Sequence, residues 1–232
     1  MNDSIIIFGA GGFAREVAWL IRDINQQRPN NEKFQIAGFV EHSSSRIGER
    51  LNGIPIITLN DAKKIPHAKA IVAIGSPEIK ARAVREAEDA GLDFATLVHP
   101  TVLFDEDTVS IGTGSVICAG TILTVNITLG CHVIINLDCT VGHDCVLEDF
   151  VTISPGCHLS GYTNVHRSAY LGTGSVTVEG HHIGAEAVIG AGAVVVKDIP
   201  AGVTAVWGPA KRKKWEALKK MKIASNLQVF PK

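Results

Sequence analysis

The chain has 232 residues, of which 46% are hydrophobic and 19% charged, and its formal net charge is −1. This composition is typical of a globular protein with one large or two small domains. The near-zero net charge argues against a duplex nucleic-acid binder, and no apolar run reaches the roughly 18 residues of a membrane span.

The N-terminal segment "MNDSIIIFGAGG" has neither the basic start nor the apolar length of a secretory signal. The five cysteines show no paired spacing. We therefore expect reduced thiols and a cytoplasmic protein.

The first part of the chain, residues 1–100, alternates strand and helix patterns. Residues 4–8, 34–40 and 69–75 have the composition of short buried strands, and residues 13–25 and 77–91 have helical patterns. The alternation predicts an α/β domain with a small parallel sheet, about half of a Rossmann-like fold. The dipeptide His99-Pro100 marks its expected end.

A glycine-rich loop follows the first strand and opens the first helix. "GAGGFA" nearly matches the dinucleotide fingerprint, with Gly9, Gly11 and Ala14 in the key positions. Amides at a helix start bind phosphates, so we expect a diphosphate on the backbone N–H groups of Gly11, Gly12 and Phe13. We expect the ribose and base to contact Glu41, His42, Gly75 and Ser76. A tight turn without a ligand, or an NAD-binding module, remains an alternative.

From residue 105 to residue 200 the chain repeats with a period of six. Sixteen hexads follow without insertion, and fourteen of their first positions are Ile, Leu or Val. Small residues fill the fifth position, including Cys139, Cys145 and Cys157, which we expect to lie in the core. Three hexads form one coil, so residues 101–210 are predicted to form an all-β parallel β-helix.

His143 is the strongest catalytic candidate. It occupies an outward-facing third position and is followed directly by Asp144, whose carboxylate could orient the imidazole if the chain bends there. Asn136 lies about one hexad earlier, where its amide could reach the same cleft. A solvated or interface histidine is the alternative interpretation.

Four segments together carry a family resemblance: "IIIFGAGGFAREV", "VAIGSPEIKARA", "INLDCTVGHDC" and "VIGAGAVVVKDIPAGVTAVWGPAK". The chain resembles hexapeptide-repeat sugar acetyltransferases, which include nucleotide-amino-sugar N-acetyltransferases and sialic-acid O-acetyltransferases. The resemblance implies a left-handed β-helix, acetyl-CoA as cosubstrate, and a homotrimer with active sites between subunits. It also implies that His143 acts as the general base in direct acetyl transfer.

The resemblance further implies an acceptor and a set of cosubstrate contacts. The acceptor would be a UDP- or dTDP-linked 4-amino-4,6-dideoxy sugar in surface glycan synthesis; O-acetylation of sialic acid and a non-enzymatic scaffold are the alternatives. Acetyl-CoA would contact Thr152, Gly161, Thr173, Ala191 and Lys211. Thr152 stands where family members often carry a second histidine.

The basic tail, residues 211–232, is expected to form a helix that caps the coil. Its charge, beginning with Lys211, would attract the phosphates of CoA. A solvated cap without that role is the alternative.

We expect no metal. Some β-helices hold zinc on three histidines, but the spacing of the histidines in the repeat does not fit such a site. His181 falls in an interior slot of the repeat.

Overall fold

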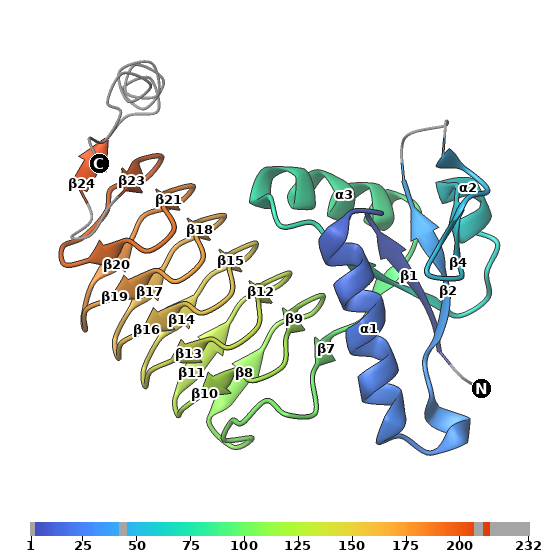
Figure 1. The fold of residues 1–232 in the computed structure, drawn as a ribbon, viewed down its shortest axis with the longest axis horizontal. Coiled ribbons are helices and arrows are strands. Elements are labelled where there is room, and N and C mark those ends of the chain that lie inside the picture. The colour runs from blue at the N-terminus through green and yellow to red at the C-terminus, as the bar shows by residue number, and fades with distance from the viewer. Residues whose placement is uncertain (1–2, 42–45, 207–210, 214–232) are drawn as a thin grey trace, which may run out of the picture.

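The computed structural model describes residues 3–41, 46–206 and 211–213, which form an α/β domain packed against one end of a β-helix (Figure 1). Both parts of the predicted fold class are confirmed. Within the described residues, no helix is long and apolar enough to cross a membrane.

The α/β domain is built on a six-stranded sheet of order β3-β4-β2-β1-β5-β6. The three predicted strands are present as β1 (Ser4–Phe8), β2 (Gln35–Val40) and β5 (Ala68–Val72), all parallel. Three short strands escaped prediction: β3 (Arg50–Leu51), β4 (Ile54–Ile57) and β6 (Asp93–Phe94). Of these, only β3 is antiparallel to its neighbour.

Helices cover both faces of this sheet because the side chains of β1 alternate between them. Ile5 and Ile7 share a core cluster with helix α1 (Gly12–Gln26), whereas Ile6 and Phe8 share another with helix α3 (Pro77–Asp89). The remaining helical segments are the short α2 (Leu59–Ala62) and a 3₁₀ turn, η1 (Asn30–Glu32).

The β-helix has three sheets, and from β8 to β22 each strand pairs in parallel with the strand 18 residues away, as Ile134 does with Thr152. We call them sheets A, B and C. Sheet A contains β7 (Leu97–Val98), β9 (Val116–Ile117), β12 (Ile134–Ile135), β15 (Thr152–Ile153), β18 (Tyr170–Leu171), β21 (Val188–Ile189), β23 (Thr204–Val206) and β24 (Lys211–Lys213). Sheet B contains β10 (Ile122–Leu123), β13 (Thr140–Val141), β16 (His158–Leu159), β19 (Val176–Thr177) and β22 (Val194–Val195). Sheet C contains β8 (Val109–Ile111), β11 (Ile127–Leu129), β14 (Val146–Leu147), β17 (Asn164–Val165) and β20 (His182–Ile183).

The repeat departs from a strict period of six at both ends. At the start, the coil begins with β7 at Leu97, before the expected boundary, and Phe104 packs against the core where the hexad count placed Asp105. At the end, Ile199 pairs with Ile183, which shortens the last hexad by two residues. The predicted sixteen uninterrupted hexads are therefore correct only in the middle.

The basic tail begins as a strand and not as the predicted helix. Lys211–Lys213 form β24, which runs antiparallel to β23 and ends sheet A. Residues 214–232 lie outside the described residues.

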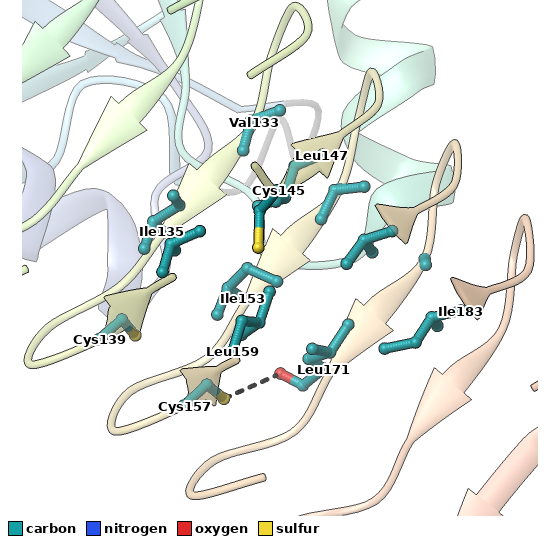
Figure 2. Close-up of a cluster of buried hydrophobic side chains, with 14 of the residues drawn as sticks. Val133, Ile135, Cys139, Cys145, Leu147, Ile153, Cys157, Leu159, Leu171 and Ile183 are labelled. Atoms are coloured by element: carbon teal, nitrogen blue, oxygen red, sulfur yellow. Dashed lines mark hydrogen bonds between the residues drawn. The ribbon is translucent and has the colours of Figure 1, made fainter. Parts of the chain in front are cut away.

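The coil interior is a continuous cluster of buried side chains. Cys139, Cys145 and Cys157 are fully buried among the aliphatic residues of the core, as predicted (Figure 2). The Sγ of Cys157 lies 3.4 Å from the Oγ of Ser175 one coil away. His181, expected inside, is instead partly exposed and reaches the carboxylate of Asp198 at 3.3 Å.

The α/β domain rests on the outer face of sheet A through both of its long helices. Val116, Cys118 and Ile134 of the β-helix belong to the same core cluster as α1. Phe150 belongs to the cluster that contains α3. These contacts place the α/β domain beside sheet A of the β-helix.

Candidate active site

His143 and Asp144 form a close pair on the turn between sheets B and C, which we call the His143 corner. Asp144 has a positive φ of 58°, a conformation that Asp tolerates better than most residues. This bend brings the two side chains together, although neighbours on a strand would point apart. The Nδ1 of His143 lies 2.9 Å from a carboxylate oxygen of Asp144.

The pair has a defined proton arrangement. Asn126, one coil earlier, donates its side-chain N–H to the other carboxylate oxygen of Asp144 at 3.2 Å. The hydrogen bond from His143 is the main cause that holds the pKa of Asp144 below its usual value. An ionised carboxylate only accepts hydrogen bonds, so Nδ1 carries a proton, and in the neutral imidazole Nε2 then presents the lone pair.

The imidazole is held on two further sides. The ring of Tyr162 meets it edge-on, with 5.1 Å between the ring centroids. A Cβ on Gly161 would come 2.5 Å from the Cε1 of His143, so only glycine leaves room for the ring here. Among the described residues, no hydrogen bond reaches Nε2, and the side chain of His143 is 48% exposed. The corner therefore presents an oriented, accessible base.

Three of the other predicted transferase residues, Asn136, Thr173 and Ala191, lie at the turns between sheets A and B, which we call the Thr173 corner. Thr173 and Ala191 are exposed there, one coil apart. Asn136 lies at the same corner, and its side-chain oxygen accepts a hydrogen bond from the backbone of Leu137. Within one chain the structure does not bring Asn136 to His143.

Thr152 and Gly161 are both covered. Thr152 is 3% exposed on sheet A, and its hydroxyl accepts a hydrogen bond from Lys80 of α3 at 2.9 Å. Contact with acetyl-CoA at Thr152 would require α3 to move away. Gly161 is buried under the ring of His143, so it supports the base. Of Lys211, the structure describes the backbone in β24.

The glycine loop has the geometry expected of a phosphate site. Gly9 has φ +106°, and a Cβ there would lie 3.1 Å from the carbonyl oxygen of Ala73, so the tight turn requires glycine. Gly11 is the N-cap of α1, with no side-chain cap and no acidic residue in the first turn. Gly11 and Gly12 are exposed and Phe13 is partly buried. Amides at this helix start are available to an anion.

The remaining predicted nucleotide contacts lie at the same edge of the sheet. The loops after β1 and β5 diverge there, which is the switch point where parallel sheets bind ligands. Glu41 ends β2; one carboxylate oxygen accepts from Arg46 at 3.1 Å, and the other is buried without a partner among the described residues. An orphaned buried oxygen of this kind fits a ligand hydroxyl or N–H donor.

Ser76 caps α3, follows Gly75, and lines a cavity of about 460 Å³ between the start of α3 and β18. Tyr170 and Glu186 form the opposite wall of this cavity. This edge of the sheet therefore opens toward the β-helix. His42 lies outside the described residues.

No group of three or more His, Cys, Asp or Glu side chains within the described ranges could hold a metal ion. His166 pairs with Glu148 at 2.8 Å, and its ring stacks on that of His182. His132 is buried between Phe94 and Phe150. These histidines are explained by packing and by hydrogen bonds to single partners.

Sequence reasoning missed Asn126, Tyr162 and Lys80. The coil length of 18 residues would have identified the first two, because residues 18 or 19 positions apart stack in neighbouring coils. Lys80 carried a different signal: it occupies the apolar stripe formed by Ala83, Val84 and Ala87.

Comparisons of the sequence with known proteins match it to sugar acetyltransferases and their domains. The family model described as "PglD N-terminal domain" matches residues 4–87. GDP-perosamine N-acetyltransferase of Escherichia coli O157:H7 is 32% identical over 90% of this chain and 95% of that protein.

Two solved structures extend the likeness to the whole fold. A mutant of perosamine N-acetyltransferase from Caulobacter crescentus, in complex with CoA and GDP-perosamine, has a TM-score of 0.82 at 29% identity, covering 90% of this chain and 96% of that one. The acetyltransferase domain of PglB from Neisseria gonorrhoeae, in complex with acetyl coenzyme A, has a TM-score of 0.82 at 32% identity, covering 92% of this chain and 100% of that one.

Proposed function

This chain belongs to the family of hexapeptide-repeat sugar acetyltransferases and uses acetyl-CoA, and on that premise we propose that it acetylates the amino group of a nucleotide-linked sugar with His143 as the base. The single observation that carries the proposal is the half-exposed imidazole of His143, oriented by Asp144, whose carboxylate lies 2.9 Å from Nδ1. This is the arrangement that removal of a proton from an attacking nitrogen requires.

The proposed reaction is direct. The sugar nitrogen forms a bond to the thioester carbonyl carbon while Nε2 of His143 accepts a proton from that nitrogen. The carbon–sulfur bond then breaks, CoA leaves as the thiolate, and the proton held by His143 passes to it directly or through solvent, which restores the base. The cysteines of the β-helix core are buried, so no acyl-enzyme on them is needed.

The nucleotide end of the acceptor would occupy the edge of the α/β domain. Its diphosphate would lie on the amides of Gly12 and Phe13, where the helix start favours negative charge. The unpartnered oxygen of Glu41 would accept from a ribose hydroxyl or a base N–H. GDP-perosamine is named in one similar protein and bound in another, which favours GDP over the UDP or dTDP that we expected from the sequence. GDP-perosamine is therefore the first substrate to test.

The site would be completed by a second copy of the chain in a homotrimer. His143 lies at one corner, whereas Asn136, Thr173 and Ala191 lie at another, so no single chain presents them together. Exposed apolar residues flank the His143 corner, including Val125, Tyr162 and Val178. Such a surface is typical of a contact between subunits.

Measurement of CoA release tests the substrate. Acetyl-CoA is supplied with GDP-perosamine, with UDP- and dTDP-linked 4-amino sugars, or with sialic acid. We expect rapid release with one nucleotide-linked amino sugar. Release with sialic acid alone would replace N-acetylation with O-acetylation.

Subunit mixing tests whether the site is shared. His143→Asn removes the base, and Gly12→Asp repels the diphosphate, so each variant alone is inactive. If each site takes its base and its loop from different chains, a 1:1 mixture of refolded subunits recovers about a quarter of the wild-type activity. If one chain holds both parts, the mixture remains inactive.

A further inference from the structure

Lys80 of α3 is a buried amine with no acidic partner. It is 1% exposed, and among the described residues no ion pair involves it. Burial of an ammonium group in an apolar interior is unfavourable, and burial lowers the pKa of Lys80 well below its ordinary value. A methionine or leucine would satisfy the apolar stripe of α3 equally well, so the amine needs another explanation.

The amine of Lys80 binds the β-helix at one place. Its Nζ donates to the carbonyl oxygen of Val151 at 3.1 Å and to the hydroxyl of Thr152 at 2.9 Å. These two contacts join residues more than 70 positions apart in the chain. They give the buried nitrogen two hydrogen-bond partners, so the amine is held in place without a counter-ion.

On the α/β side, Lys80 lies one helical turn from the edge of the sheet where we propose that the nucleotide binds. We call its two contacts with Val151 and Thr152 the Lys80 tie. The backbone N–H of Lys80 donates to the carbonyl oxygen of Ser76 at 2.8 Å, which closes the first turn of α3. Ser76 and Pro77 line the cavity that opens toward Tyr170. Any movement of the Lys80 contact along the β-helix would therefore move this edge with it.

On the β-helix side, Thr152 lies in the same coil as His143. It follows His143 by nine residues, half of the 18-residue turn that separates Ile134 from Thr152. Tyr170, on the wall of the cavity, pairs with Thr152 from the next coil. Lys80 thus holds the α/β domain at the level of the catalytic corner along the helix axis.

We propose that Lys80 is a positioning residue, which through Thr152 and Val151 sets the height of the nucleotide-binding edge relative to His143. The inference rests on the proposed function, including the trimer. In a three-fold assembly, equivalent residues lie at equal heights along the axis, so this tie also sets the height of a bound amino sugar relative to His143 of the next subunit.

The test compares Lys80→Met and Thr152→Val with Thr152→Ser, which keeps the acceptor, and with Arg82→Met, an exposed control on the same helix. We expect kcat for N-acetylation to fall about 10- to 100-fold in the first two variants, because small misplacements of reacting groups have effects of that size. The Kd values for GDP and acetyl-CoA should remain unchanged, since neither binding surface includes Lys80. The double variant should be no slower than the single variants, and Thr152→Ser and Arg82→Met should behave as wild type.

Hydrogen exchange supplies a readout that does not depend on activity. The hydrogen-bonded amides of residues 80–84 in α3 should exchange faster in Lys80→Met, while those of the sheet stay protected. Wild-type kcat together with unchanged exchange would overturn the inference. If the wild-type protein acetylates no amino sugar but Lys80→Met still exchanges faster, the positioning contact of Lys80 is retained and the proposed function is rejected. Loss of GDP or acetyl-CoA binding in parallel with kcat would show a general structural defect and would also overturn the inference.

Discussion

The imidazole of His143 lies directly against the backbone of Gly161, 18 residues further along the chain, where a Cβ would come within 2.6 Å of Nε2. The backbone of the next coil therefore forms one wall of the His143 corner. Gly161 does not have a positive φ, so this close approach, and not a turn, is the reason for glycine.

Gly161→Ala should displace the ring of His143. We expect kcat to fall about 10- to 100-fold, because the base leaves its position between Asp144 and Tyr162. Thermal unfolding and acetyl-CoA binding show whether the coil is intact. Wild-type turnover in a folded variant would mean that the base does not need the observed ring position.

Asp144→Asn should leave the turn in place and alter the proton arrangement. The amide cannot hold the Nδ1–H tautomer as a carboxylate does, and we expect a fall in kcat of about 10- to 100-fold. Asp138→Asn is the matched control, since Asp138 has the same positive φ on an exposed turn of the previous hexad. Equal losses in both variants would assign the effect to the turn.

His132 should make the protein sensitive to acid. Burial is the main cause that lowers the pKa of His132 from 6.5 to about 4, and the charge of Lys80 adds to it. Between pH 6.5 and 4 the unfolded chain binds more protons, so stability falls as the pH falls through this window. The free energy of unfolding falls by about 3 kcal/mol in total across this window.

In His132→Phe this part of the pH dependence of the free energy of unfolding should disappear. Denaturant titrations between pH 4 and 7 measure it. His67→Asn is the control, at an exposed position with positive φ that Asn tolerates. Identical acid slopes in wild type and His132→Phe would contradict the prediction.

Lys80 should have a signature of the same sign, at higher pH. Its pKa in the folded protein is well below 10.5, so between that value and 10.5 the unfolded chain binds more protons. Wild-type stability relative to Lys80→Met should therefore rise with pH, by about 1.4 kcal/mol per pH unit at most. Parallel stability curves from neutral pH to 10.5 would show that Lys80 titrates normally.

The sequence predicts the fold well where a local pattern determines it. The hexad spacing places Ile135, Val141 and Leu147 in the core because every inward position must be filled. It fails at Phe104 and Ile199, where one extra residue or two missing residues fit into turns that have no apolar signal. Short strands such as β3 and β6 contain two residues each and have no detectable period.

The candidate site could be predicted in part. His143 and Asp144 are neighbours in the chain, so their pairing required only a turn at Asp144. Asn136 was expected near His143 because it is close in sequence, but one hexad turns the chain to another corner. The burial of Thr152 depends on a helix more than 70 residues earlier, which no local pattern reveals.

The most direct test of the account is the turnover of His143→Asn with acetyl-CoA and GDP-perosamine, together with the Kd of both ligands. We predict that kcat falls about 10²- to 10⁴-fold, the range for loss of a general base, while both Kd values change little. Wild-type kcat in this variant would contradict the assignment of His143 as the base.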